Sequence, residues 1–157
     1  SSEDTKKLNV IMYSLRDYER IADLAQNTVI KMQNIYATKE KITNEAVGEM
    51  AKMLEVCYLA VKDTINMFLQ RDLKFGASVN EKEEYIDKLE RKAIKNHMNR
   101  TREGKCVGSA AVIYVDIISD IERIGDHAVN IVEHYTYKDL VLTPEEEDLD
   151  LSKFIIE

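Results

Sequence analysis

Apolar residues recur every three or four positions along most of this chain, a pattern typical of amphipathic helices. It predicts helices over about residues 5–36, 43–75, 80–102 and 109–135. Short breaks separate them, the second at Phe75–Ser78. Thr43 is placed to cap the second helix, and Gly104 to end the third. Because short connections make neighbouring helices antiparallel, we expect an all-α, up-down antiparallel bundle of four long helices.

The apolar stripes predict which face of each helix is buried. In the first helix the stripe consists of Leu8, Ile11, Leu15, Tyr18, Ala22, Ala25, Val29 and Met32. In the fourth helix it consists of Ala111, Tyr114, Ile118, Ile121, Gly125, Ala128 and Val132. In an up-down bundle these two helices can lie side by side.

The helical pattern ends before the acidic segment at the end of the chain. We therefore expect residues 1–136 to form the bundle and residues 137–157 an acidic C-terminal tail. Residues 139–157 hold seven acids and one lysine, so the tail carries most of the net charge of −7. The body is nearly balanced in charge, which argues against a nucleic-acid partner. Apolar tail residues could dock on the bundle or on a partner, and the bundle should fold without residues 139–157.

One phrase of the sequence occurs twice, at residues 17–29 and 120–132. Eight of the thirteen positions are identical, including the pair Glu19 and Asp23, which returns as Glu122 and Asp126. Hydrophobic periodicity would repeat apolar positions but not carboxylates. The repeat therefore predicts a duplicated structural unit with a duplicated site.

Helical geometry places both acid pairs on the same side of their helices. With about 100° per residue, Glu19 and Glu122 fall about 60° from the centre of the apolar stripe, and Asp23 and Asp126 about 100°. Each pair thus lies on the shoulder of the stripe, one turn apart.

Other carboxylates are weaker candidates for the same site. Glu83 and Asp87 in the third helix have the same spacing and the same helical phase. Glu133 extends the row in the fourth helix, where the first helix has Ile30 instead. Asp120 points nearer the outer face, as does its counterpart Asp17, so both rank below the Glu/Asp pairs.

Two carboxylates one turn apart repel each other, so a positive group should accompany them. One interpretation is a salt bridge to Arg or Lys from a neighbouring helix. The other, which the duplication favours, is a metal cation held by oxygen ligands. Di-iron carboxylate enzymes of the ferritin type use Glu-x-x-His, but isoleucine stands three residues before each of the three histidines. A ferritin-like metalloenzyme and a non-metal helical interaction domain stay as alternatives.

The phrase at residues 120–131 closely resembles the signature of PhoU-type domains. The resemblance implies an all-α fold of spectrin-like three-helix repeats with E(D)xxxD motifs, whose carboxylates bind a divalent or ferric ion, iron or zinc foremost. It assigns Glu19, Asp23, Glu122 and Asp126 as metal ligands, with Glu83 and Asp87 as completing ligands. In the first helix Ala22 replaces the motif glycine. The implied role is regulation of phosphate uptake, without catalysis.

A second stretch, residues 97–106, resembles the cytoplasmic region that follows the membrane part of bacterial sodium/phosphate cotransporters. This implies the last helix of one repeat followed by a complete second repeat. It also implies a transporter portion or the phosphate-uptake machinery as partner, and a cytoplasmic location at the inner face of the membrane. A bundle that lacks part of a repeat has reason to form a homodimer.

Overall fold

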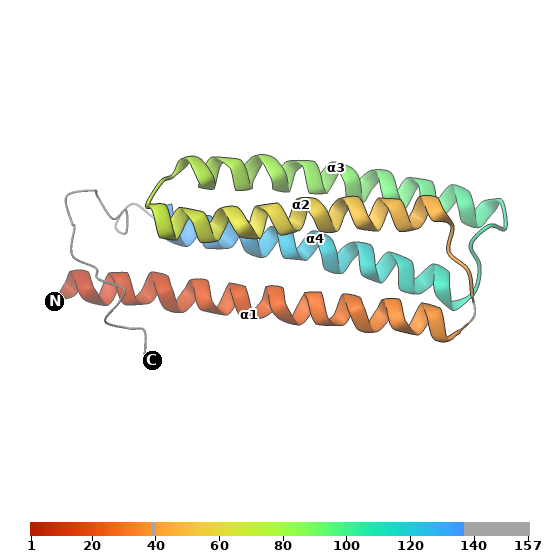
Figure 1. Ribbon diagram of the computed structural model, residues 1–157, viewed down its shortest axis with the longest axis horizontal. Helices are drawn as coiled ribbons and strands as arrows, with labels where there is room; N and C mark the ends of the chain where they lie inside the picture. The colour runs from red at the N-terminus through yellow and green to blue at the C-terminus, as the bar shows by residue number, and fades with distance from the viewer. Residues whose placement is uncertain (39, 137–157) are drawn as a thin grey trace.

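The computed structural model describes residues 1–38 and 40–136, which form four long helices and, within these ranges, no strand. The helices are α1 (Ser2–Ala37), α2 (Asn44–Gln70), α3 (Lys74–Arg102) and α4 (Ser109–Thr136). Successive helices run antiparallel in one elongated bundle (Figure 1). The predicted fold class is therefore confirmed. The tail, residues 137–157, lies outside the described residues.

At two of the three turns, the residues predicted to start or end a helix do so. Thr43 caps α2 by accepting a hydrogen bond from the backbone N–H of Ala46 at 3.2 Å. Gly104 follows the end of α3 with a φ of +68°, a conformation that suits glycine. Backbone geometry thus explains why these helices end where the sequence indicated.

The predicted break at Phe75–Ser78 is wrong, because these residues lie in the first turns of α3. Helix α2 ends earlier than predicted, at Arg71, which takes the left-handed conformation with a φ of 52°. Asp72 then accepts a hydrogen bond from the backbone N–H of Lys74. Gly76 serves packing instead: a Cβ there would lie 3.0 Å from a methyl group of Val132.

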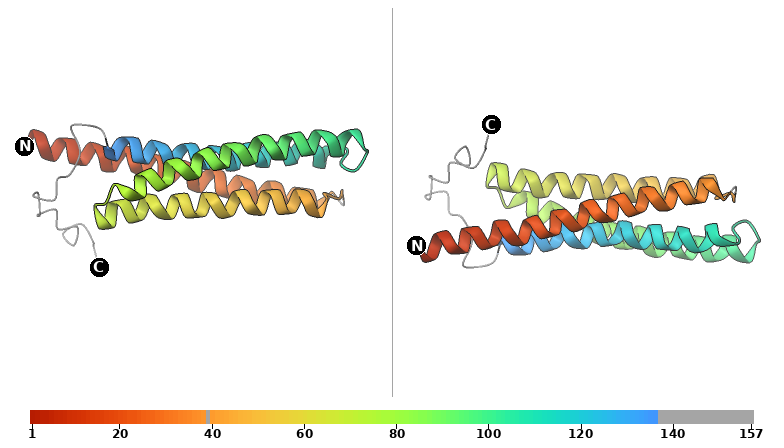
Figure 2. Two further views of the ribbon diagram at one scale, coloured as in Figure 1. Left: turned by 90° about the horizontal axis from the view of Figure 1, so that it is seen from above. Right: turned by 90° about the horizontal axis from the view of Figure 1, so that it is seen from below.

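Helix α4 lies at the centre of the packing (Figure 2). It contacts α1, α2 and α3, and α2 also packs against α3. No Cα atom of α1 comes within 8 Å of α2 or α3 among the described residues. Helix α1 is therefore attached chiefly through α4.

This arrangement overturns the predicted buried face of α1. Leu8, Leu15 and Val29, from the predicted stripe, are 56%, 60% and 54% exposed. The buried residues of α1 are instead Val10, Ser14, Asp17, Ile21, Leu24, Thr28 and Ile35. In α4 the predicted stripe is buried, because α2 and α3 cover it while α1 covers a second face. Helix α1 has the same two faces, but its second face only touches α2 in part, as at the hydrogen bond between Tyr18 and Thr64, and stays largely exposed.

The contact between α1 and α4 is approximately symmetric. Asp17 accepts hydrogen bonds from His127 Nδ1 at 2.8 Å and pairs with His134 Nε2 at 3.3 Å. Its counterpart Asp120 pairs with Lys31 Nζ at 2.5 Å. Lys31 and His134 are themselves equivalent positions of the repeat. Each aspartate thus contacts the equivalent position of the opposite helix, as expected for antiparallel helices about a twofold axis.

Candidate metal centre

Three carboxylates meet where α3 packs against α4. Asp87 and Glu90 come from α3 and Glu122 from α4, and one oxygen of each lies within 4.8 Å of the others. All three side chains are half-buried. No other group of three or more acid, histidine or cysteine side chains is so arranged in the part of the chain that the structure describes. Three converging oxygen ligands can hold a hard or borderline cation.

Two further acids, Asp126 and Glu83, adjoin this cluster. The negative charge of Asp126 helps to raise the pKa of Glu122, and that of Asp87 helps to raise the pKa of Glu83. Burial, with the negative charge of Asp126 and Glu90 next, raises the pKa of Glu122 to about 7. Burial and the charges of Asp87 and Asp126 also raise the pKa of both Glu83 and Glu90. The five acids therefore share an uncompensated negative potential.

A glycine allows the two helices to approach at this point. A Cβ at position 125 would lie 3.1 Å from Ile86 Cδ1 and 3.9 Å from Glu83 Cγ. Gly125 stands between Glu122 and Asp126 in α4, and Ile86 is fully buried. The motif glycine thus brings the acids of α4 to those of α3.

Basic side chains do not neutralise the five acids. Within residues 1–38 and 40–136, no Lys, Arg or His nitrogen pairs with them at 4.0 Å or less, although such pairs form elsewhere in the bundle. Asp63, for example, lies 2.6 Å from Lys82, and Glu49 lies 2.8 Å from Arg100. Arg91 lowers the pKa of Glu90 only as the weakest influence on that group. The salt-bridge interpretation therefore has no partner residue here.

The cluster unites part of the site that the sequence predicts. It brings together Glu122 and Asp126 with Glu83 and Asp87, the pair on the third helix. It adds Glu90, which sequence reasoning missed. Glu90 lies three residues after Asp87, and this spacing, which places both on one face of a helix, could have identified it.

The remaining candidates lie elsewhere. Glu19 and Asp23 are exposed on α1 and belong to no such group among the described residues. Glu133 is exposed as well. Asp120 is only 7% exposed and pairs with Lys31, so it is not near the outer face as expected. Asp17 is equally buried, which corrects the same expectation.

The three histidines take no part in the cluster. His97 stacks on Tyr114 in the core, with 4.7 Å between ring centroids. Its Nδ1 atom is buried and has no hydrogen-bond partner in the described part of the chain. His127 and His134 contact Asp17 at the interface of α1 with α4. The donor set of the cluster is thus oxygen alone.

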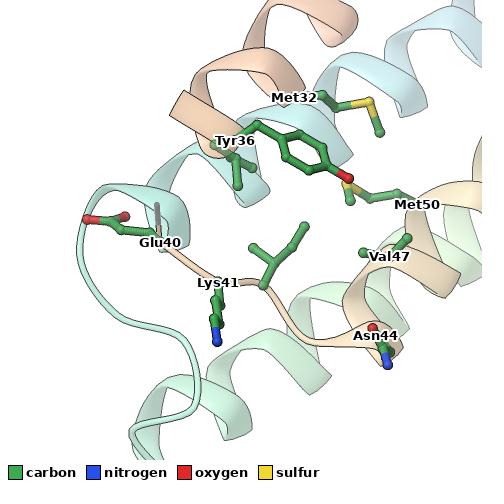
Figure 3. A pocket seen from close by; sticks show the side chains of 9 residues that line it. Met32, Tyr36, Glu40, Lys41, Asn44, Val47 and Met50 are labelled. Carbon is green, nitrogen blue, oxygen red and sulfur yellow. The ribbon is translucent and has the colours of Figure 1, made fainter. Parts of the chain in front are cut away.

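A cavity of about 440 Å³ lies at the turn from α1 to α2. Met32, Tyr36, Val47 and Met50 are among its lining residues (Figure 3). None of the five acids borders it. Its walls are mainly apolar, and it is separate from the carboxylate cluster.

None of the described helices is long and apolar enough to cross a membrane. Residues 50–134 match the family model of the PhoU domain. This range contains the whole carboxylate cluster.

Three curated proteins are similar to the chain. It is 32% identical over 135 residues to the phosphate-specific transport system accessory protein PhoU homolog 1 of Thermotoga maritima, covering 84% of this chain and 57% of that protein. It is 26% identical over 133 residues to the PhoU homolog of Rhizobium meliloti, covering 83% and 55%. With the PhoU homolog of Clostridium acetobutylicum it shares 22% identity over 149 residues, covering 95% and 65%. The chain thus spans less than two thirds of these relatives, and no solved structure matches it.

Proposed function

The chain belongs to the PhoU domain family, and on that premise we propose that it is a regulatory, metal-binding helical domain that acts in phosphate transport and phosphate homeostasis. The curated relatives carry the name of phosphate-specific transport system accessory proteins. The observation that supports metal binding in this chain is the carboxylate cluster of Asp87, Glu90 and Glu122. We assign the domain no catalytic residue.

The chemistry of the cluster fits a cation. Besides burial, the charges of Asp87 and Asp126 help to raise the pKa of Glu83, Glu90 and Glu122. With no basic partner among the described residues, the five carboxylates would be stabilised by a bound positive ion. Asp87, Glu90 and Glu122 would hold it, and Asp126 and Glu83 would either bind or orient the ligands. Oxygen ligands suit a hard or borderline divalent or ferric ion. From the resemblance to PhoU-type domains, iron or zinc are the metals we propose.

The second acid pair, Glu19 and Asp23, would form a site only together with further helices. By the approximate twofold axis, their face of α1 is the counterpart of the α4 face that α2 and α3 cover. The α1 face is exposed and apolar, with Leu15 and Val29 60% and 54% exposed. A helix pair that supplies acids, as α3 does for α4, would complete the second site.

We further propose that the domain is the cytoplasmic part of a sodium/phosphate cotransporter, located at the inner face of the cell membrane. The resemblance of residues 97–106 to that region supports this assignment. The test is the sequence that precedes Ser1 in the gene. Several apolar runs of about 20 residues there would agree with the proposal. A reading frame that encodes a separate protein without such runs would contradict it.

A ferritin-like metalloenzyme is a weaker alternative, because no histidine adjoins the cluster in the described part of the chain. Metal-dependent oxidase activity of the purified protein would favour it. A non-metal interaction bundle is the other alternative, and elemental analysis separates it from our proposal.

The decisive comparison uses the full chain purified without chelator. Changing Glu122→Gln and Asp126→Asn together keeps the side-chain shapes and removes two negative charges. Bound metal, measured by elemental analysis, should fall at least tenfold while the helical content stays the same. The matched control changes Glu19→Gln and Asp23→Asn on α1, which have the same types and spacing but belong to no carboxylate cluster among the described residues. It should keep its metal. Equal metal content in all three proteins would contradict the assignment.

A further inference from the structure

Helices α1 and α2 present two apolar stripes next to each other on one side of the bundle. The α1 stripe steps strictly by three and four residues, through Leu8, Ile11, Leu15, Tyr18, Ala22, Ala25, Val29, Met32 and Tyr36. The α2 stripe consists of Val47, Leu54, Tyr58, Val61, Ile65 and Leu69. None of these side chains is buried within the described residues, and we call their surface the α1–α2 face. A strict heptad spacing on an exposed apolar face is typical of a helix that pairs with another helix.

The α1–α2 face is large enough to hold a stable dimer together. At about 1.5 Å per residue the α1 stripe is about 40 Å long, and two adjacent helices are about 20 Å wide. The face therefore measures on the order of 800 Å², which is about the area that each partner buries in a stable complex.

The face carries both protruding side chains and recesses, at matching distances. One recess, of about 280 Å³, lies between the helices at Ile11, and the cavity of about 440 Å³ described above lies at Met32. The side chains of Leu8 and Val29 line neither recess and are 56% and 54% exposed. Leu8 and Val29 lie 21 residues apart, as do Ile11 and Met32, which is about 32 Å along the helix. An antiparallel copy of α1 can thus place its Leu8 at Met32 and its Val29 at Ile11.

A single register makes this fit along the whole α1 stripe. In it a twofold axis passes α1 at about residue 20, and two antiparallel copies of the helix pair their apolar residues in four layers. The layers are Leu8 with Met32, Ile11 with Val29, Leu15 with Ala25 and Tyr18 with Ala22 of the copy. The two alanines each meet a larger side chain, so the layers interdigitate as coiled-coil packing requires.

The same axis also pairs the α2 stripe with itself. Tyr18 Oη lies 2.8 Å from Thr64 Oγ1, and α1 and α2 run antiparallel, so residue 20 is level with about residue 62. An axis at that level places Tyr58 against Ile65 of the copy, and Leu54 against Leu69 of the copy. Both helices therefore meet apolar partners about one axis, which is the self-complementarity of a twofold interface.

Charge near this axis is balanced. Glu19 on α1 and Lys62 on α2 are exposed beside the stripes, close to the level of the axis. Two copies bring two acids and two lysines to the centre of the interface, so no net charge accumulates there. The face therefore matches a second copy of itself in charge as well as in shape.

From these observations we propose that two copies of this chain associate through the α1–α2 face. The two α1 helices pair antiparallel about the twofold axis, and the two α2 helices pair beside them, which gives a four-helix interface. The second apolar face of α1, which the bundle leaves largely exposed, is covered in this dimer. The interface uses no residue of the carboxylate cluster, so the inference does not depend on metal binding.

Sedimentation of the full chain over a range of concentrations, with a chelator present, tests the surface. The wild type should be a dimer, and Leu8→Asp/Val29→Asp should weaken dimerisation at least tenfold while circular dichroism shows the same helical content. The control is Met98→Asp/Val112→Asp, because these residues are 52% and 65% exposed but lie on α3 and α4. It should dimerise like the wild type. A wild type that stays monomeric, or equal weakening in both variants, would overturn the proposal and leave the face to a helix of another protein or to a segment outside residues 1–157.

Disulfide trapping tests the register. In Leu15→Cys/Ala25→Cys the new cysteines meet only across the axis, so mild oxidation should link most molecules into covalent dimers. The native Cys57 and Cys106, each 2% exposed, should not react. Leu8→Cys/Ala25→Cys is the control, since its cysteines lie at different levels in this register, and it should give at least fivefold less linked dimer. Equal linkage in the two variants, or efficient linkage of Leu15→Cys alone as in parallel pairing, would overturn the antiparallel dimer.

Discussion

Ile86 of α3 lies against Gly125 of α4 so closely that a Cβ at position 125 would come within 3.1 Å of the Ile86 Cδ1 atom. The contact sits inside the carboxylate cluster, because Gly125 is flanked by Glu122 and Asp126 in α4. Helix α1 carries Ala22 at the equivalent position, and no α3-like helix covers it. Close packing of α3 on α4 is therefore what brings the acids of two helices together.

We predict that Gly125→Ala and Ile86→Val are coupled. Alanine normally stabilises a helix interior by about 1 kcal/mol relative to glycine. Contact with Ile86 Cδ1 should cancel most of that gain, whereas Ile86→Val removes this atom and should restore it. Urea denaturation of the two single variants and the double variant should give a coupling of about 0.5–1 kcal/mol. Strict additivity would show that the helices are not in close contact here.

The metal-free protein should lose stability as the pH rises towards neutrality. The pKa of Glu122 is about 7 in the folded state, against an ordinary value of 4.5, so the folded protein retains a proton that the unfolded chain releases. The free energy of unfolding should thus fall between pH 4.5 and 7, on the order of 1 kcal/mol after solvent screening. Chemical denaturation at a series of pH values measures it.

Substitution isolates the contribution of Glu122 to that pH dependence. Glu122→Gln cannot titrate, so its unfolding free energy should change less over the same range. Glu133 is an exposed acid on the same helix. The unfolding free energy of Glu133→Gln should therefore change with pH as much as that of the wild type. If the unfolding free energies of wild type and Glu122→Gln depend on pH in the same way, burial and neighbouring acids do not raise the pKa of Glu122.

Asp120 should matter for stability and not for metal binding. It pairs with Lys31 at 2.5 Å, and its side chain is only 10% exposed. Asp120→Asn leaves the lysine without a counter-charge and should lower the unfolding free energy by about 1–2 kcal/mol. Adding Lys31→Met should recover part of the loss. Metal content should not change, and a metal loss in Asp120→Asn would place Asp120 among the ligands.

Glu90, which lies outside the repeated phrase, should act as a ligand. Its carboxylate lies within 4.8 Å of those of Asp87 and Glu122, so Glu90→Gln should weaken metal binding at least tenfold. Titration of the metal-stripped protein, followed calorimetrically, measures this. The control is Glu84→Gln, an exposed acid on the same helix. Equal affinities of the two variants would exclude Glu90 as a ligand.

The sequence predicted the fold well because strong periodicity marks helices and local chemistry marks their ends. Thr43 and Gly104 illustrate this, since a cap and a left-handed turn depend on adjacent residues. The α2–α3 turn was misplaced because Gly76 looks like a break and instead permits close packing against Val132. A contact with a residue far along the chain is not visible in local sequence.

Contacts between residues far apart in the chain also decide which of the predicted acids come together. Phase put Glu83 and Asp87 on the same shoulder of their stripe as Glu122 and Asp126, and the resemblance grouped them. They lie close together because α3 packs beside α4. Phase could not show that the second face of α1 would stay largely exposed, although its sequence is so similar to that of α4. It also could not show that Asp17 and Asp120 are buried, since that depends on contacts between α1 and α4.

The metal centre itself can be tested most directly by anomalous diffraction. Crystals of the metal-stripped protein should be soaked with Fe²⁺ or Zn²⁺, and data collected on both sides of the absorption edge of the metal. The predicted result is an anomalous peak within about 2–2.5 Å of oxygen atoms of Asp87, Glu90 and Glu122. The contradicting result is a cluster without a peak, or one in which a lysine or arginine side chain takes the place of the metal.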